Sequence, residues 1–184
     1  MVRTNRDLRE PLRGKKSFRG KKLLNCRWCD SQITGMRRSF CSDVCVHEHK
    51  LRSDVGYMRK AVFERDNGIC SVCKRDCEKL KKDALEILKV GNDATKFLKE
   101  AGFPERRIKL FLNKEKGASL WDADHVIPVI LGGGGCGLEG MRTLCVPCHD
   151  YITHDQRRMI ALGISINQTV LWDDNKLYSE NKND

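Results

Sequence analysis

Eight of the ten cysteines in this 184-residue chain stand in four closely spaced pairs. The first two pairs are Cys26-x2-Cys29 and Cys41-x3-Cys45. Each pair forms one turn that directs two thiolates at one point, and two such turns satisfy the tetrahedral coordination of Zn²⁺. The spacing therefore predicts a structural zinc site made by all four cysteines. His47 and His49 follow closely, and the replacement of Cys45 by one of them is the alternative.

The other two pairs are Cys70-x2-Cys73 and Cys145-x2-Cys148, with 71 residues between them. We predict a second structural zinc site here, although the spacing alone leaves open whether the two pairs share one ion. A shared ion would tie together the ends of the intervening segment. Its binding free energy, about 10–16 kcal/mol in small peptides, is comparable with the whole stability of a domain. Cys77 and Cys136 are left over, and we interpret both as buried or incidental thiols.

The first residues of the chain are polar and charged, so we expect no secretory signal. The expected location is intracellular: nuclear in a eukaryote, otherwise cytoplasmic. Grouped cysteines in such a chain bind metal more often than they form disulfides. Hydrophobic residues make up 40% of the sequence, which excludes disorder throughout. No apolar run approaches the roughly 18 residues of a membrane span, so we expect no membrane association.

The formal net charge of +10 favours a polyanionic partner, most often a nucleic acid. Residues 1–22 hold nine Lys or Arg and two acids, and we interpret them as a disordered basic arm. A solvated tail that only aids solubility is the alternative. The arm residues expected to bind nucleic acid are Arg13, Lys15, Lys16, Arg19, Lys21 and Lys22.

The remaining chain divides into a four-Cys zinc finger, a larger domain and a tail. Their predicted bounds are 23–49, 50–163 and 164–184. Apolar periodicity and end residues predict helices over 50–67, 77–90, 94–101, 104–112 and 149–162. We also predict strands over 120–127 and 166–172 and a glycine loop at 132–135. The helices between 74 and 118 form a predicted helical insertion in the larger domain.

One stretch of the larger domain carries a recognisable order of motifs. It runs Trp121-Asp122-Ala123-Asp124-His125-Val126-Ile127-Pro128, then four glycines, then Leu144-Cys145-Val146-Pro147-Cys148-His149. With the Cys70 pair before it, this order resembles the HNH endonuclease family over roughly residues 57–162. The resemblance implies an α+β fold: a small, zinc-stapled, treble-clef-like ββα-metal core with a helical insertion, preceded by the four-Cys finger.

The finger and the larger domain together narrow the resemblance. The finger contains the turn Phe40-Cys41-Ser42-Asp43-Val44-Cys45. This turn, the four glycines and the helical insert are similar to the C-terminal zinc-finger and HNH regions of vertebrate annealing helicases, over about residues 24–160.

The resemblance assigns roles to three residues. It implies that His125 is the general base, and that Asp124 and His149 bind a catalytic divalent ion, Mg²⁺ or Mn²⁺. The alternatives are an Asp-His pair that only decorates the surface, and a His149 that serves as a zinc ligand. His154 lies about 140° around the helix from His149, so we interpret it as a surface residue or at most a phosphate contact. Thr153 shares the helix face of His149.

The chain departs from the family at one central position. The family's Asn, which braces the hairpin and helps to orient the His base, is replaced in register by Gly140. Glu139 and Arg142 are the candidates to compensate, and weak or absent catalysis is the alternative outcome.

These observations favour a metal-dependent DNA endonuclease, with branched or single-stranded DNA among its candidate substrates. The competing hypothesis is a zinc-dependent nucleic-acid-binding module with weak or no catalysis. A zinc adaptor that binds only protein is the third hypothesis, and it leaves the basic arm without a role. The expected cofactors are two structural Zn²⁺ and one catalytic divalent ion.

Overall fold

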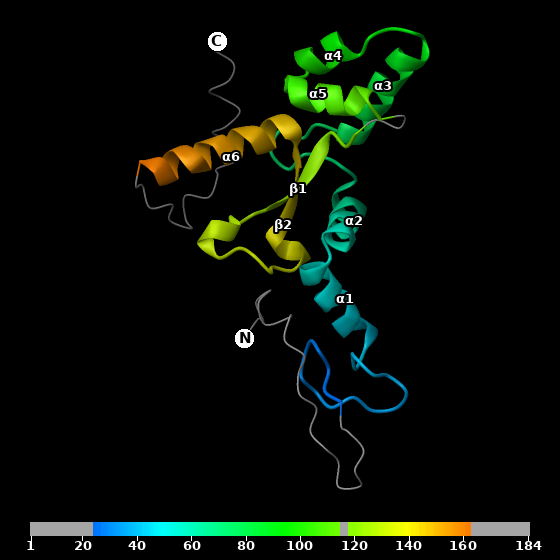
Figure 1. Cartoon of the computed structure of the whole chain (residues 1–184), viewed down its shortest axis with the longest axis vertical. Helices are drawn as coiled ribbons and strands as arrows, with labels where there is room; N and C mark the ends of the chain where they lie inside the picture. Colours follow the sequence, from blue (N-terminus) through cyan, green and yellow to red (C-terminus); the bar gives the residue numbers. More distant parts are fainter. Residues whose placement is uncertain (1–23, 115–117, 163–184) are drawn as a thin grey trace. The chain divides into compact units, whose positions relative to one another are not determined.

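The computed structural model describes residues 24–114 and 118–162, and these form two compact units (Figure 1). The first unit contains residues 24–61 and 127–141, and the second contains the described residues of 62–126 and 142–162. The described residues hold six α-helices and one two-stranded sheet. The predicted mixed α+β class is therefore confirmed.

Helix α1 begins inside the four-Cys finger of the first unit. It spans Asp43–Ser53. The hydroxyl of Ser42 accepts the backbone N–H of Cys45 at 3.2 Å and caps the helix, as serine commonly does. The second cysteine pair, Cys41 and Cys45, thus straddles the start of α1, which holds the two thiols at a fixed separation.

Asp54 separates α1 from α2, which spans Val55–Asp66. Its backbone is extended, with φ −126° and ψ 107°. Its carboxylate accepts the backbone N–H of Tyr57 at 3.0 Å. The single helix predicted over 50–67 is therefore wrong. The apolar spacing continues across the break, but an aspartate that binds a free N–H at a helix start stabilises a cap instead of a continuous helix.

The glycine run 132–135 lies in a turn, as predicted, after a short 3₁₀ segment at Val129–Leu131. Gly133 is the most constrained member, because a Cβ atom there would lie 1.7 Å from the backbone oxygen of Ile127. Its backbone N–H donates to Pro128 O at 3.1 Å. The close approach of two backbones explains why this position takes glycine.

The second unit is built around a two-stranded sheet and the helix that follows it. Strand β1, Trp121–His125, pairs with β2, Met141–Cys145, and helix α6, Val146–Ala161, packs against β1 (Figure 1). Trp121 anchors β1: its ring stacks on Phe63 with 5.8 Å between centroids. β1 is shorter than the strand predicted over 120–127, because the chain bends directly after His125. All five residues of β2 are buried.

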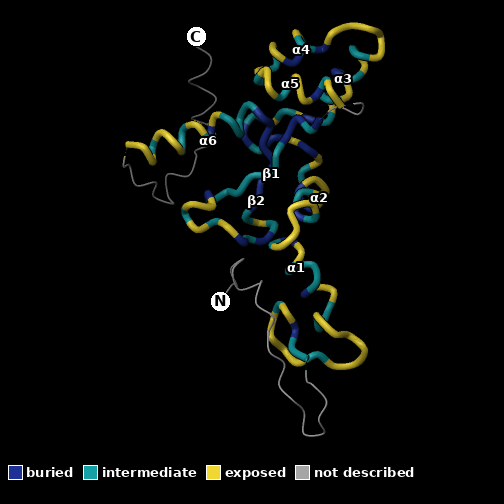
Figure 2. Tube along the Cα trace, in the orientation of Figure 1, coloured by how far each residue is buried: buried dark blue, intermediate teal, exposed yellow. Residues whose placement is uncertain are grey.

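The predicted helical insertion contains three helices. They are α3, Cys77–Lys89, α4, Thr95–Glu100, and α5, Glu105–Leu112. Asp76 caps α3 by accepting the backbone N–H of Lys79 at 2.8 Å, and Pro104 stands just before α5 instead of inside it. Five apolar residues of the insertion are buried: Ala84, Leu98, Phe103, Ile108 and Phe111. Figure 2 colours the chain by burial, with buried segments in dark blue.

Three predictions concern residues that the structure does not describe. They are the basic arm 1–22, the tail 164–184 and the strand at 166–172.

Helix α6 begins at Val146, three residues before the predicted start at residue 149. No helix in the described ranges is long and apolar enough to cross a membrane.

Candidate functional site

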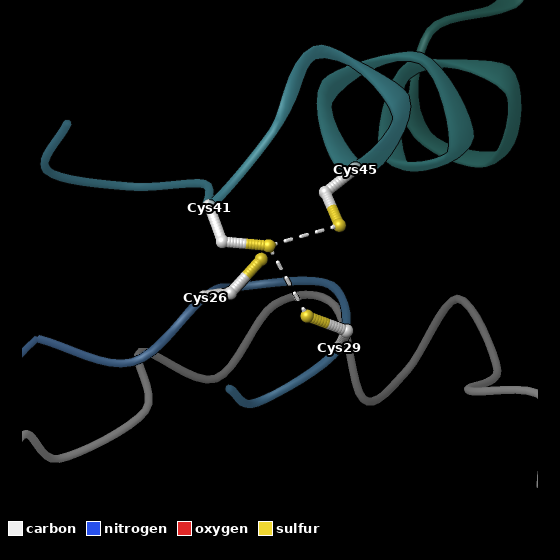
Figure 3. Close-up of side chains that lie close together, drawn as sticks. All are labelled: Cys26, Cys29, Cys41 and Cys45. Atoms are coloured by element: carbon white, nitrogen blue, oxygen red, sulfur yellow. Dashed lines mark hydrogen bonds between the residues drawn. The ribbon is translucent and has the colours of Figure 1, made fainter. Parts of the chain in front are cut away.

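The structure gathers the first four cysteines at one point. The Sγ atoms of Cys26, Cys29, Cys41 and Cys45 all lie within 4.8 Å of one another and point inward (Figure 3). Cys41 Sγ is 3.5 Å from Cys29 Sγ and 3.4 Å from Cys45 Sγ. Four thiol donors in this arrangement are the donor set that structural Zn²⁺ prefers, so the group can hold the predicted ion.

The electrostatics of this group favour a bound cation. Hydrogen bonds from Ser31 lower the pKa of Cys29 to about 6. Hydrogen bonds to the sulfurs of Cys45 and Cys29 raise the pKa of Cys41 to about 12, because a thiol that donates to a neighbouring sulfur holds its proton more tightly. A cation at the centre would replace these protons and let all four cysteines deprotonate.

The two histidines after Cys45 have other partners. His47 Nδ1 lies 2.8 Å from the hydroxyl of Tyr57. His49 Nδ1 lies 3.1 Å from Ser53 Oγ, and its ring meets Phe40 edge to face. The structure thus favours Cys45, and neither histidine, as the fourth ligand.

The second set brings together cysteines from distant parts of the second unit. The Sγ atoms of Cys70, Cys73, Cys145 and Cys148 lie within 4.8 Å of one another, and Cys73 Sγ is 3.6 Å from Cys145 Sγ. Hydrogen bonding to Cys145 lowers the pKa of Cys73 to about 6. The pairs separated by 71 residues can therefore hold one Zn²⁺ between them.

The two remaining cysteines stand apart from both sets. Cys77 is buried, and burial raises its pKa to about 12. Burial also raises the pKa of Cys136. Both therefore stay protonated near pH 7, which agrees with their interpretation as unreactive thiols.

The structure places two of the three predicted nuclease residues together. Asp124 on β1 and His149 in the first turns of α6 face each other, with 3.9 Å between Asp124 Oδ1 and His149 Nε2. His125 is the last residue of β1 and takes no part in the ion contacts recorded within the described ranges. Alternation along the strand directs its side chain to the face opposite Asp124, and the chain bends immediately after it.

Three further charged residues extend the Asp124–His149 pair. Arg142 on β2 contacts Asp124 Oδ2 at 3.1 Å. On the other side, Asp122 Oδ2 lies 3.7 Å from His149 Nδ1 and accepts a hydrogen bond from Arg107 of α5. The result is a row of two arginines and two aspartates on either side of one imidazole. We call it the charge row, and its members are Arg107, Asp122, His149, Asp124 and Arg142.

Sequence reasoning missed Asp122 as a member of the site. The spacing of Asp122 from Asp124 could have predicted it. Residues two apart on a strand share a face, so Asp122 and Asp124 point the same way. Arg107 carried no comparable signal, because it comes from the helical insertion and reaches β1 only through the tertiary fold. Arg142, one of the two candidates to compensate for Gly140, contacts Asp124.

Asp124 and His149 could hold a divalent cation. Two ligands of one octahedral ion, with bonds of about 2.0–2.1 Å, lie about 2.9 Å apart at neighbouring positions and about 4.1 Å apart at opposite positions. The observed separation is 3.9 Å, so the two atoms would have to approach by about 1 Å to bind as neighbours. Arg142 occupies the other carboxylate oxygen and leaves Oδ1 directed at His149. Among the described residues, only the two cysteine sets offer three or more ligand atoms together. A cation here would therefore complete its coordination with water and substrate phosphate.

Gly140 has no space for the side chain that the family carries there. A Cβ atom at this position would lie 2.5 Å from Cys136 Cβ and 2.8 Å from its Sγ. Glu139, the other candidate to compensate, is exposed, and its carboxylate lies over Gly137. His154 is exposed on α6, as predicted, and Thr153 is half-buried.

Comparisons with known proteins agree on one relative. No family model matches the chain. Three curated proteins named DNA annealing helicase and endonuclease ZRANB3 align over 123 residues: those of Bos taurus, Mus musculus and Homo sapiens, at 31%, 32% and 31% identity. The alignment covers 65% of this chain and 11% of each relative, so the chain spans about a ninth of their length.

One solved structure also aligns with part of the chain. The crystal structure of the human ZRANB3 HNH domain aligns at 26% sequence identity with a TM-score of 0.42. It covers 60% of this chain and 95% of that domain.

Proposed function

Because the chain carries an HNH-type domain related to that of ZRANB3, we propose that it is a metal-dependent DNA endonuclease. It hydrolyses a phosphodiester bond and leaves a 3′-hydroxyl and a 5′-phosphate. The names of the relatives join a helicase and an endonuclease activity, and the proposal adopts only the endonuclease activity. The observation that carries it is the pairing of Asp124 Oδ1 with His149 Nε2 at 3.9 Å.

Asp124 and His149 would hold the catalytic ion, Mg²⁺ or Mn²⁺. Such an ion neutralises phosphate charge and stabilises the leaving oxygen. Arg142 fixes the Asp124 carboxylate through Oδ2, so that the other oxygen stays directed at His149. The two structural Zn²⁺ would hold the finger and the second unit in shape.

His125 acts as the general base. A neutral imidazole near pH 7 accepts a proton from the attacking water. Its position directly after Asp124, at the end of β1, puts the base and the metal ligand next to each other in the chain and on opposite sides of the strand. For both side chains to serve one phosphate, the strand has to bend locally, and the observed bend directly after His125 supports this.

DNA is the proposed partner, and the arm supplies part of its binding. The basic residues of the arm, Arg13, Lys15, Lys16, Arg19, Lys21 and Lys22, would contact backbone phosphates. Contacts of this kind carry no sequence preference. The proposed enzyme therefore recognises the form of its DNA, branched or single-stranded, more than its sequence.

The second candidate function is a nucleic-acid-binding module without turnover. One observation favours it: Gly140 stands where the family has its bracing Asn, and Cys136 fills the space of that side chain. On this account the cysteine sites and the basic arm remain functional, and His125 lacks the orientation that catalysis requires.

A cleavage assay on plasmid and branched DNA with Mg²⁺ or Mn²⁺ separates the two candidates. The variant Asp124→Asn should lose metal-dependent nicking, because it loses a charged metal ligand. His154→Ala, an exposed histidine on the same helix as His149, is the matched control and should cleave at the wild-type rate. Salt-dependent DNA binding without cleavage by the wild type would establish the second candidate. Absence of nucleic-acid affinity even at low salt would revive the protein-only adaptor.

A further inference from the structure

His149 presents a buried nitrogen that nothing hydrogen-bonds. Its Nδ1 atom is shielded from solvent and has no hydrogen-bond partner within residues 24–114 and 118–162. An unpaired polar atom in such a place is costly, and its nearest charged neighbour is Asp122 Oδ2 at 3.7 Å. That distance is about 0.5 Å beyond the upper limit of an ordinary N–H···O hydrogen bond, so the imidazole has to rotate toward the carboxylate for the bond to form.

Asp122 is itself held in place. Arg107 donates to the same Oδ2 atom from α5, and both side chains are about four-fifths buried, with 23% and 22% exposed. A carboxylate fixed by an arginine on one side remains an acceptor on the other. The group facing Nδ1 is therefore a positioned hydrogen-bond acceptor.

Arg106, the residue before Arg107, makes a similar ion pair, but with a residue of α6 and not with Asp122. Arg106 pairs with Asp150 on α6 at 2.6 Å. Successive residues of α5 thus reach α6 directly, through Asp150, and reach His149 through Asp122. The first contact fastens the insertion to α6, and only the second adjoins the imidazole.

We propose that Asp122, held by Arg107, is a positioning residue that keeps the proton of His149 on Nδ1 and so leaves the Nε2 lone pair directed at Asp124. Carboxylates commonly fix metal-binding histidines in this way. The inference gives the helical insertion a task in the site, through Arg107. This inference depends on the proposed function in one respect only: it takes from it that His149 Nε2 binds a divalent ion.

The direct test is the protonation state of the His149 ring. Long-range ¹H–¹⁵N spectra of the zinc-loaded full chain, at about pH 8 where an ordinary imidazole is neutral, report which nitrogen carries the proton. A His149→Ala sample assigns the signals. The wild type should carry the proton on Nδ1. In Asp122→Asn the amide can donate to Nδ1, which favours the opposite tautomer, so the proton should move to Nε2.

Mn²⁺ titration gives a second readout. The dissociation constant should rise about 10–100-fold in Asp122→Asn, the usual effect of losing such a partner. Arg107→Gln should shift both readouts in the same direction by less. Arg106→Gln, which removes the parallel ion pair from the same helix, is the matched control and should change neither. Zinc content and circular dichroism verify that each variant is folded.

The outcomes keep this inference separate from the proposed function. A wild-type proton on Nε2, or the same tautomer in wild type and Asp122→Asn, overturns the positioning role even if the protein cleaves DNA. A tautomer that moves as expected in a protein that never cleaves DNA supports the positioning role and rejects the endonuclease. If Asp122→Asn does not fold, Arg107→Gln decides, and an unchanged tautomer in that variant overturns the inference.

Discussion

At the scale of single residues, Gly140 departs from the pattern of the family that the chain resembles. A Cβ atom there would meet both side-chain atoms of Cys136. The two positions therefore depend on each other: a side chain at 140 requires a smaller residue at 136. This contact explains why the Asn cannot simply be restored.

We predict that Gly140→Asn lowers the free energy of unfolding by about 1–3 kcal/mol, the range typical of overpacked sites. Adding Cys136→Gly removes the atoms that the new side chain meets and should recover much of the loss. Urea denaturation followed by fluorescence measures both variants. Equal denaturation midpoints for Gly140→Asn and wild type would mean that the two residues are not in tight contact.

Single residues also show what a sequence can and cannot tell about a site. The cysteine pairs and the Asp124-His125 step are local patterns that the sequence shows directly. The spacing left open whether the Cys70 and Cys145 pairs share one ion, and only the fold brings these two pairs together. The position of Asp122 on the same face as Asp124 could have been predicted from the alternation of side chains along a strand. The position of Arg107 could not, because its contact with Asp122 joins an insertion helix to a strand, and such contacts depend on tertiary packing.

At the scale of elements, predictions succeeded where end residues and periodicity agreed. Helix α3 begins at Cys77, as predicted, directly after its capping Asp76, and ends at Lys89, one residue before the predicted end. At Asp54 the two signals disagree. The apolar spacing continues past this residue, but its side chain caps the start of α2 and the helix is interrupted there. Strand β2 is buried at every position and so lacks the alternation that marks a half-buried strand. Only the resemblance to the family implied a strand at the position of β2.

Each cysteine set should behave as an independent zinc-binding element. We predict that Cys29→Ser and Cys73→Ser each remove one zinc ion per chain, whereas Cys136→Ser, outside both sets, retains full zinc content. Binding free energies of about 10–16 kcal/mol match the stability of a whole domain, so Cys73→Ser should also unfold the second unit. Metal analysis and circular dichroism measure these outcomes. Full zinc content in Cys73→Ser would refute the second site.

At the scale of the whole molecule, the positive charge is concentrated in the arm. The arm holds nine basic and two acidic residues, a net +7 of the chain's +10. Residues 23–184 carry the remaining +3. Four thiolates and one Zn²⁺ together carry −2, so two filled cysteine sets add −4 and bring this body to about −1. On the proposed function, attraction to DNA would then come mainly from the arm and the catalytic ion.

Deleting residues 1–22 should therefore weaken DNA binding and flatten its salt dependence. The slope of log affinity against log salt should fall by about 0.9 for each phosphate that the arm neutralises in the full chain. Deleting residues 164–184 removes a similar length with two basic and four acidic residues, and it is the matched control that should not flatten the slope. Fluorescence anisotropy across a salt series measures both. An unchanged slope without the arm would show that the arm binds no phosphates.

The central claim is that His125 acts as the base in a metal-dependent cut. A side-by-side measurement of plasmid nicking by wild type and His125→Ala, both zinc-loaded and in Mg²⁺ or Mn²⁺, tests it most directly. General-base catalysis contributes typically about 10²–10⁴-fold, so the variant should cleave at least about 100-fold more slowly while binding DNA as tightly. Equal nicking rates, whether both high or both at background, would contradict the claim.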